Sequence, residues 1–400
     1  MKILFSPCHY IYDEYHGGSE YSWAFEIANR TALKNLDSVV ITGFKKLHNE
    51  KPYNIIEIQS EKKVLDTSIK NAIVFSFKYF LETERQLKNN FDILHHVLPF
   101  SINRTFNLSL ILKRKVTPSV IGPVQSSLSL PDWDKLINKK PLLFYIFRFV
   151  YYLLKPVLKI LSNLTLKRAD VVVVINGYTK NLLIKNGIDK NKLIIIPPGI
   201  DIKKFEYISF DKKRSDLVEL LVVCYLVKRK AVDLVIKAIN EVVKEKKNII
   251  LRIIGDGPQK ENLQNLVDKF KLGQYVVFED FVPNSEVQKY YQKAHIFVSM
   301  SRSESWGQMY LEAMASGLPI ITTKNNGSLS IIKNERFAYL VEQEDYIDLS
   351  KKILRLLVNI NLIAELGENA RFEAEKYYDW DNCIIPKYLE IYNKLIKNHE

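Results

Sequence analysis

Two carboxylates eight residues apart, Glu304 and Glu312, are the side chains that we expect to do chemistry in this chain. They stand in the string Glu-Ser-Trp-Gly-Gln-Met-Tyr-Leu-Glu-Ala-Met-Ala-Ser-Gly-Leu-Pro, which follows an apolar run at 295–300. The pattern predicts a strand, a loop and then a helix that begins near Gly307 and ends at Gly317. One acid then lies ahead of a helix N-terminus and the other on the helix flank. The free N–H groups between them suit a phosphate, so a ligand with a sugar, a diphosphate and a ribose would use the whole arrangement.

The string resembles the signature of the retaining glycosyltransferases of family four, with Trp306 at the aromatic position and every other named position filled. The resemblance implies that Glu304 contacts hydroxyls of the donor sugar and that Glu312 holds the ribose of the nucleotide. A βαβ unit with two solvated glutamates is the alternative, but the glycine, alanine and proline positions favour the functional interpretation. The residues that open the helix and would also bind the donor are Gly307, Gln308 and Met309.

A basic turn, Lys228-Arg229-Lys230, follows the first strand pattern of the second half. The family carries a basic loop here, whose arginine and lysine neutralise the donor diphosphate, and Lys230 matches the lysine. The arginine position falls on Tyr225, however, and Ala231 replaces the glycine that follows the lysine. Arg229 is the candidate to supply the missing charge, because a guanidinium binds phosphate through two hydrogen bonds. A solvated basic turn is the alternative.

Adjacent glycines, Gly17 and Gly18, lie between the first strand and the first helix. Glycine permits a close approach of the backbone to a ligand, and an ordinary turn is the alternative. In the family this loop lies over the donor pyrophosphate and the acceptor, and Glu20 matches the acidic position after it. We therefore assign the two glycines to the donor and Glu20 to the acceptor side.

Two histidines, His95 and His96, end a strand pattern in the first half. Open α/β sheets bind ligands at the carboxyl ends of their strands, and the pair resembles the His-His-Val-Thr form of some family members. We assign His96 to catalysis and His95 to the acceptor side, without a basis for choosing which of them faces the cleft. A packed or solvated histidine is the alternative for each.

Strand and helix patterns alternate along the chain, which is typical of parallel, doubly wound α/β folds. The alternation restarts near residue 218, so we expect two Rossmann-like domains with a hinge near 198–210. The resemblance implies that these domains face a cleft, as in the GT-B fold. The expected parts are an acceptor-binding domain over 1–203, a nucleotide-sugar-binding domain over 204–379, and a last helix at about 380–400 that returns to the first domain.

The charge and the cysteine content restrict the possible binding partners and the possible cellular compartment. The net charge is +13, but the basic residues are scattered and we find no nucleic-acid motif. We therefore expect sugar phosphates or an anionic membrane surface, and no nucleic acid. Three distant cysteines form neither a disulfide framework nor a zinc site, which indicates a reducing, cytoplasmic compartment. The aromatic segment 141–161 has a basic stripe, Arg148, Lys155 and Lys159, and fits either a membrane-interface helix or a packed one.

Together these features predict a retaining, metal-independent glycosyltransferase. It would move a sugar from a UDP- or GDP-linked donor to a glycan or lipid-linked acceptor, in cell-surface polysaccharide or glycolipid synthesis. No cofactor is expected, because basic side chains and a helix N-terminus would neutralise the leaving diphosphate. The enzyme would be cytoplasmic, with peripheral attachment to the inner face of the cell membrane. The alternatives are a nucleotide-sugar-binding subunit with little activity, which Tyr225 motivates, and a nucleotide-sugar epimerase on the same fold.

Overall fold

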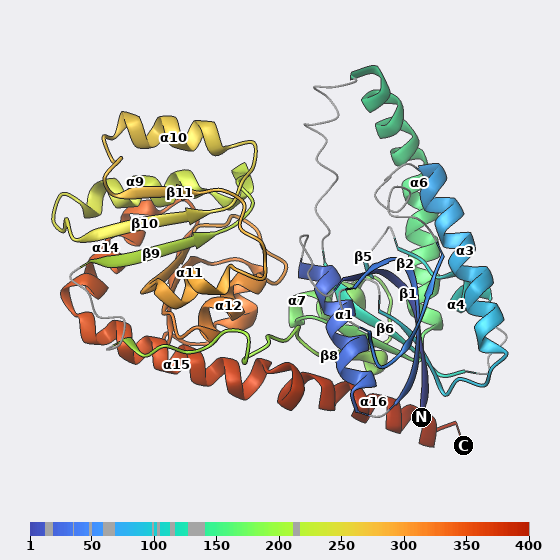
Figure 1. Ribbon diagram of the computed structural model, residues 1–400. Helices are drawn as coiled ribbons and strands as arrows, with labels where there is room; N and C mark the ends of the chain where they lie inside the picture. The colour runs from blue at the N-terminus through green and yellow to red at the C-terminus, as the bar shows by residue number, and fades with distance from the viewer. Residues whose placement is uncertain are drawn as a thin grey trace. The chain divides into compact units, whose positions relative to one another are not determined.

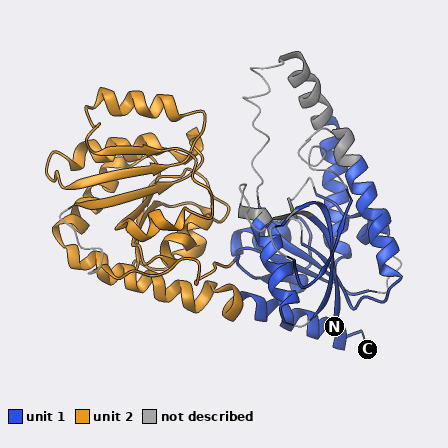
Figure 2. Cartoon of the chain, viewed as in Figure 1, with its two compact units in different colours: residues 1–198, 384–400 blue, residues 199–383 orange. Residues whose placement is uncertain are grey.

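The chain folds into two compact units, residues 1–198 with 384–400 and residues 199–383 (Figure 2). The computed structural model describes residues 1–12, 19–34, 36–47, 50–58, 69–97, 100–101, 105–112, 117–126, 141–210 and 217–399, some of them, including 141–152, by backbone alone. Both units are α/β with an all-parallel sheet. The predicted fold class, two parallel doubly wound sheets, is confirmed.

The first unit is built on eight parallel strands in the order β3-β2-β1-β4-β6-β7-β8, with the short β5 beside β6 (Figure 1). The strands are β1 (Lys2–Tyr12), β2 (Asp37–Lys46), β3 (Asn54–Glu57), β4 (Ile93–His96), β5 (Phe100–Ser101), β6 (Ser119–Gln125), β7 (Val171–Val174) and β8 (Leu193–Ile195). The helices are α1 (Ser19–Ala32), α3 (Ile69–Leu87), α4 (Leu108–Leu112), α6 (Pro141–Arg168), α7 (Gly177–Lys185) and α16 (Ile385–Lys397).

Neighbouring residues of a strand point to opposite sides of the sheet. Helices pack against the side chains on both sides. Leu4 of β1 belongs to a buried cluster that includes Tyr79 of α3, Leu110 of α4 and Leu166 of α6. On the other face Phe5 packs against the ring of His95, which also contacts the tyrosines of α16.

The second unit has six parallel strands in the order β11-β10-β9-β12-β13-β14. The strands are β9 (Val218–Val223), β10 (Ile249–Ile254), β11 (Val276–Glu279), β12 (Ile296–Ser299), β13 (Ile320–Thr323) and β14 (Ala338–Val341). The helices are α9 (Val232–Val242), α10 (Lys260–Lys269), α11 (Gln288–Lys293), α12 (Gln308–Ala315), α13 (Asn326–Ile331), α14 (Tyr346–Val358) and α15 (Ile360–Tyr378).

The strand order of the second unit contains a switch point between β9 and β12. From β9 the chain builds outward through β10 and β11, and then returns to place β12 on the other side of β9. Ligands of doubly wound proteins bind at the carboxyl ends of the two strands at such a point. The loops after β9 and β12 carry the basic turn and Glu304, so the topology brings together the residues that the sequence singled out.

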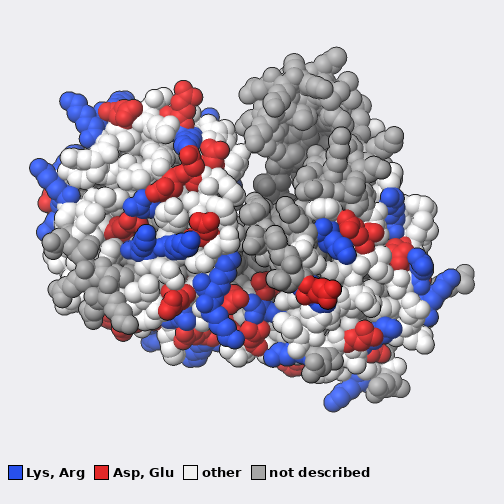
Figure 3. Space-filling view, in the orientation of Figure 1, with Lys and Arg blue, Asp and Glu red and all other residues white. Residues whose placement is uncertain are grey.

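No helix in the described part of the chain is long and apolar enough to cross a bilayer. On the face shown in Figure 3, basic and acidic side chains are interspersed over both units. The net charge of +13 is therefore not gathered into one basic field on that face.

Candidate active site

The loops that follow β9 and β12 are fastened together by hydrogen bonds. The backbone N–H of Arg302 donates to the carbonyl of Arg229 at 2.9 Å, and its guanidinium donates to the carbonyl of Lys228. In return, the guanidinium of Arg229 donates to the carbonyl of Ser303. The basic turn is a single turn of 3-10 helix, Lys228–Lys230. It therefore lies at a fixed position against the loop that carries Glu304.

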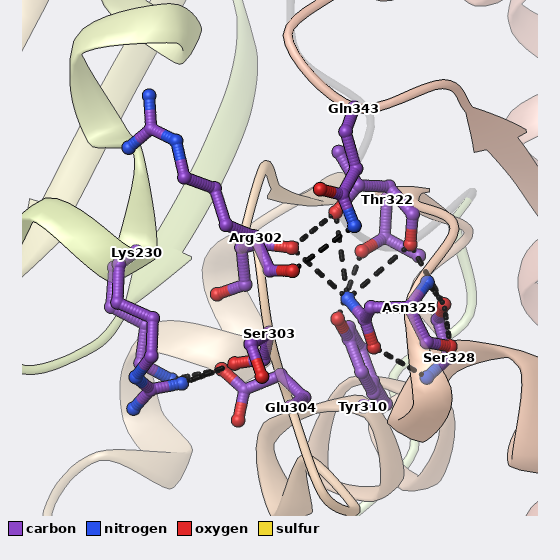
Figure 4. A network of polar contacts seen from close by, with 12 residues as sticks. Lys230, Arg302, Ser303, Glu304, Tyr310, Thr322, Asn325, Ser328 and Gln343 are labelled. Atoms are coloured by element: carbon purple, nitrogen blue, oxygen red, sulfur yellow. Dashed lines mark hydrogen bonds and ion pairs between the residues drawn. The ribbon is translucent and has the colours of Figure 1, made fainter. Parts of the chain in front are cut away.

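Glu304 accepts from two cations at one carboxylate oxygen (Figure 4). The ammonium of Lys230 forms an ion pair with Oε1, and the guanidinium of Arg229 lies 3.2 Å from the same atom. The side chains of Glu304 and Lys230 are only 10% and 12% exposed, whereas that of Arg229 is 42% exposed. Two positive groups thus surround one negative group, and the cluster keeps a positive charge for an anionic ligand.

The Glu304 loop is also held from the side of β13 and α13. The carbonyl of Ser301 accepts from the hydroxyl of Thr323 at 2.6 Å and from the amide of Asn325 at 3.1 Å (Figure 4). The N–H of Gly327 donates to the carbonyl of Glu304 at 2.9 Å. A Cβ on Gly327 would lie 2.4 Å from the carbonyl oxygen of the neighbouring tryptophan, so only glycine allows this approach. Such a supported loop holds a carboxylate in one place.

The helix after this loop, α12, has Gly307 as its N-cap, with a φ of 89°. Glycine adopts this left-handed conformation readily, and a Cβ here would lie 2.5 Å from the ring of Tyr310. The N-cap makes no side-chain hydrogen bond to the helix, so it does not cover the N–H groups of the first turn. Gln308 donates to the carbonyl of Gly199 at 2.9 Å, and Met309 is half-buried.

Glu312 lies on the flank of α12 and is half-buried. The hydroxyl of Tyr291, a fully buried residue of α11, donates to its Oε2 at 2.7 Å. Burial raises the pKa of Glu312 above its ordinary value, and the Tyr291 hydrogen bond and the charge of Lys204 partly offset that rise. Neither Tyr291 nor Lys204 was identified from the sequence, because their approach to Glu312 depends on the packing of α11 and of the chain after residue 199.

In the first unit His95 and His96 are fully buried. Nε2 of His95 lies 3.0 Å from the carbonyl of Gly122, and Nδ1 lies 2.7 Å from the hydroxyl of Tyr392. Since a carbonyl only accepts, His95 carries its proton on Nε2. The amide of Asn107 donates to Nδ1 of His96 at 3.1 Å, which places the proton of that ring on Nε2 as well. Burial lowers the pKa of each histidine to about 3, so both rings are neutral at physiological pH.

Three further predicted residues lie outside what the structure describes in full. Gly17 and Gly18 fall in the gap before α1, and of Glu20 only the backbone, in the first turn of α1, is described. Among the predicted donor residues, the structure brings together Lys230, Arg229 and Glu304. The residues of α12 follow on the same loop, and their assignment to the donor stays a prediction.

Two family models match the chain in succession. Residues 17–204 match the model described as Glycosyltransferase Family 4, and residues 204–372 match Glycosyl transferases group 1. Two doubly wound parallel sheets with this switch-point site define a GT-B glycosyltransferase fold. The chain belongs to the group 1, family 4 glycosyltransferases and is an enzyme of that class, as the sequence predicted.

Known relatives and solved structures agree with this assignment. The chain is 26% identical to the alpha-monoglucosyldiacylglycerol synthase of Acholeplasma laidlawii over 76% of each protein. The matches to other curated relatives span 50–62% of those proteins. A glycosyltransferase from Rickettsia africae superposes with a TM-score of 0.70 at 18% identity over 99% of both chains. HepE of Anabaena, solved in complex with UDP, superposes with a TM-score of 0.68 at 15% identity over 98% of this chain and all of that one.

Proposed function

We propose that this enzyme transfers a sugar, with retention of configuration, from a UDP- or GDP-linked donor to a glycan or lipid-linked acceptor. The observation that carries the proposal is the cluster at the switch point, where Lys230 and Arg229 share one oxygen of Glu304. A carboxylate suits sugar hydroxyls, and the cations suit the diphosphate. The cluster therefore provides adjacent binding groups for the sugar and for the diphosphate of a nucleotide sugar.

Lys230 and Arg229 would stabilise the departing diphosphate. Negative charge builds on the phosphate oxygens as the glycosidic bond breaks, and cations already in place stabilise the transition state more than the ground state. Such a site needs no metal ion. By the family resemblance, the acceptor hydroxyl attacks from the side that the diphosphate leaves, and a phosphate oxygen takes the proton of that hydroxyl.

Arg229 is our candidate to replace the arginine that the family carries at the position of Tyr225. Its guanidinium reaches the same carboxylate oxygen as the ammonium of Lys230, although it stands four positions after Tyr225. It is also the more exposed of the two cations, so a ligand can reach it. This geometry supports two positive charges at the diphosphate despite the departure at Tyr225.

The remaining roles follow the family. Glu312 would hold the ribose, and the first turn of α12, from Gly307 to Met309, would face the diphosphate. The second unit would thus hold the donor. The first unit would bind the acceptor, with the glycine loop, Glu20 and one of the two neutral histidines as candidate contacts. UDP bound to HepE supports a uridine donor among the candidates.

The relatives give the least specific support for the acceptor and for the cellular location of the enzyme. A relative named as a glucosyldiacylglycerol synthase supports a lipid-linked acceptor, and hence a cytoplasmic enzyme attached to the inner face of a membrane. A role in cell-surface polysaccharide or glycolipid synthesis fits either acceptor. The exposed tyrosine at the arginine position favours a second candidate, a donor-binding subunit with little activity of its own.

Donor turnover by the purified chain separates the two candidates. Thermal shift against a panel of UDP- and GDP-sugars selects the donor, and release of the free diphosphate from it is then measured. The enzyme should slowly transfer the donor sugar to water. Lys230→Ala should lower this rate at least about tenfold, whereas Lys237→Ala, a basic control on α9, should not change it. A stabilising donor that is never cleaved, with or without acceptor extracts, would favour the binding subunit.

A further inference from the structure

An apolar surface on the first unit lies outside the site just described. Of the 21 exposed large hydrophobic side chains among the described residues, eight belong to the helix layer α3, α4 and α6. These helices cover one face of the sheet, and α4 contacts both of its neighbours. We call this set the α3–α6 surface. It comprises Val74, Phe77 and Leu81 on α3, Leu112 on α4, and Leu153, Val157, Ile160 and Leu164 on α6.

The four residues of α6 form one stripe. Their spacings of four, three and four residues place them within a narrow arc of a helix with 3.6 residues per turn. They are 66%, 51%, 59% and 40% exposed, in chain order. The buried residues Ser162, Thr165 and Leu166 occupy the opposite side and attach the helix to the sheet. The stripe therefore points away from the core.

The stripe on α3 has the same form. Val74, Phe77 and Leu81 recur at three and four residues and are 41%, 53% and 52% exposed, whereas Tyr79 on the inner side is buried. Exposed apolar side chains gathered on adjacent helices mark an interaction surface, unlike the same residues scattered singly. Two stripes in one helix layer need a partner that covers both.

The charges of α6 indicate which partner this is. Its 28 residues contain five basic and no acidic side chains. Lys167 and Arg168 are exposed and flank the end of the α6 stripe on either side. Arg85, whose side chain is 77% exposed and lies 3.4 Å from the carboxylate of Glu82, continues the line of the α3 stripe. A second copy of the chain on this surface would bring together two copies of α6, whose charged side chains are all basic. An anionic bilayer complements both the apolar stripes and the charge.

We propose that the α3–α6 surface docks this protein on an anionic membrane, with both stripes inserted among the lipid chains and the basic groups on the head groups. The inference deepens the proposed function, because it names the surface through which an enzyme with a lipid-linked acceptor would reach that acceptor. It extends the expectation from the sequence, which considered the basic side of α6 and not α3. Of that basic stripe, Lys155 and Lys159 are exposed, but their helical spacing places them on the side of α6 opposite the apolar stripe, so Lys167 and Arg168 supply the basic groups of α6 at this surface. The side chain of Arg148 lies outside the described residues.

The test is co-sedimentation of the full chain with phosphatidylcholine vesicles, with and without phosphatidylglycerol, at low and high salt. Binding should require phosphatidylglycerol and weaken with salt, because screening reduces the attraction of exposed charges. Two variants remove one stripe each, Leu153→Gln/Val157→Gln/Ile160→Gln on α6 and Phe77→Gln/Leu81→Gln on α3. Each should lower vesicle affinity at least about tenfold, and Lys167→Gln/Arg168→Gln should reduce the salt dependence.

Matched controls come from the second unit. Val358→Gln/Phe372→Gln removes equally exposed apolar groups, and Lys244→Gln/Lys289→Gln removes two exposed lysines. Neither should change binding. Equal binding to neutral vesicles, or loss in the controls as large as in the stripe variants, would overturn the proposal. So would a wild-type dimer in light scattering that the stripe variants convert to monomer, since the occupant would then be a second copy. The assay contains no donor, so failure of the proposed transferase activity would leave its outcome unaffected.

Discussion

Replacing Glu312 by glutamine should make the protein more stable and its nucleotide binding weaker. Burial raises the pKa of this carboxyl, which means that the folded protein favours the neutral form more than the unfolded chain does. At neutral pH the group is held ionised at a cost of about 1.4 kcal/mol for each unit of the rise. Glutamine resembles the neutral acid in shape, and its amide oxygen can still accept from Tyr291.

The expected size is on the order of 1 kcal/mol, because the Tyr291 hydrogen bond and Lys204 already offset part of the burial. In a unit of this size that corresponds to a rise in Tm of about 2–4 °C. The pH dependence has a fixed sign. An acid whose folded pKa is raised contributes stability below its unfolded value of 4.5, and that stability is lost as the pH rises through the folded pKa. The difference in Tm between variant and wild type should therefore be largest at pH 7.5 and shrink towards pH 4.5.

Calorimetry with UDP and GDP measures the predicted loss of nucleotide affinity. Charge-assisted hydrogen bonds from the ribose hydroxyls should weaken, so affinity should fall at least about tenfold, or 1.4 kcal/mol. The control is Glu368→Gln, an exposed carboxylate on α15 of the same unit. A variant with a lower Tm at pH 7.5, or with a stability difference that does not depend on pH, would refute the reasoning about burial. Unchanged nucleotide affinity would refute the assignment to the ribose.

Three further results are expected. Lys230→Ala should lower turnover at least about tenfold, roughly 1.4 kcal/mol of barrier. Arg229→Ala should lower it equally if the guanidinium replaces the family arginine. Wild-type turnover in both variants would show that the turn is only a solvated surface turn. Glu304→Gln should lower turnover more than affinity for the free diphosphate, and equal losses would contradict a role at the sugar. His95 and His96 have folded pKa values of about 3 against an ordinary 6.5, so the unfolded chain binds more protons between these values and the free energy of unfolding should fall as the pH drops below about 6.5. Replacing both by phenylalanine should flatten that profile in denaturant titrations, and an unchanged slope would show that other groups cause it.

The fold was predictable from the sequence because each strand carries its own apolar run, but some helices were not. α3 was missed because it presents apolar residues on two sides, Tyr79 towards the sheet and Phe77 and Leu81 outward. A helix that is apolar on both sides lacks the single stripe on which sequence patterns depend. The strand pattern at the start of the sequence spans only residues 3–6, yet β1 runs to Tyr12 because pairing with β2 continues that far.

Residues of the candidate site could be singled out from the sequence, but their geometry could not. Lys230 and Glu304 are 74 positions apart, and they meet because β12 returns to the side of β9. No spacing in the sequence encodes that strand order. The hydrogen bond from Tyr291 to Glu312 likewise depends on how α11 packs against α12. The tautomers of His95 and His96 depend on a carbonyl and an amide that only the folded chain places beside them.

The two departures from the family pattern differ in kind. Ala231 occupies a glycine position, and it keeps the left-handed conformation that glycine favours, with φ 49° and ψ 41°. That conformation costs an alanine roughly 1–2 kcal/mol, so the surrounding hydrogen bonds must hold it. Tyr225 removes a charge, but Arg229 brings a guanidinium to Glu304 from the turn that Ala231 closes. The backbone shape and the number of cations are thus both retained by other residues, which favours an active transferase over a subunit that only binds the donor.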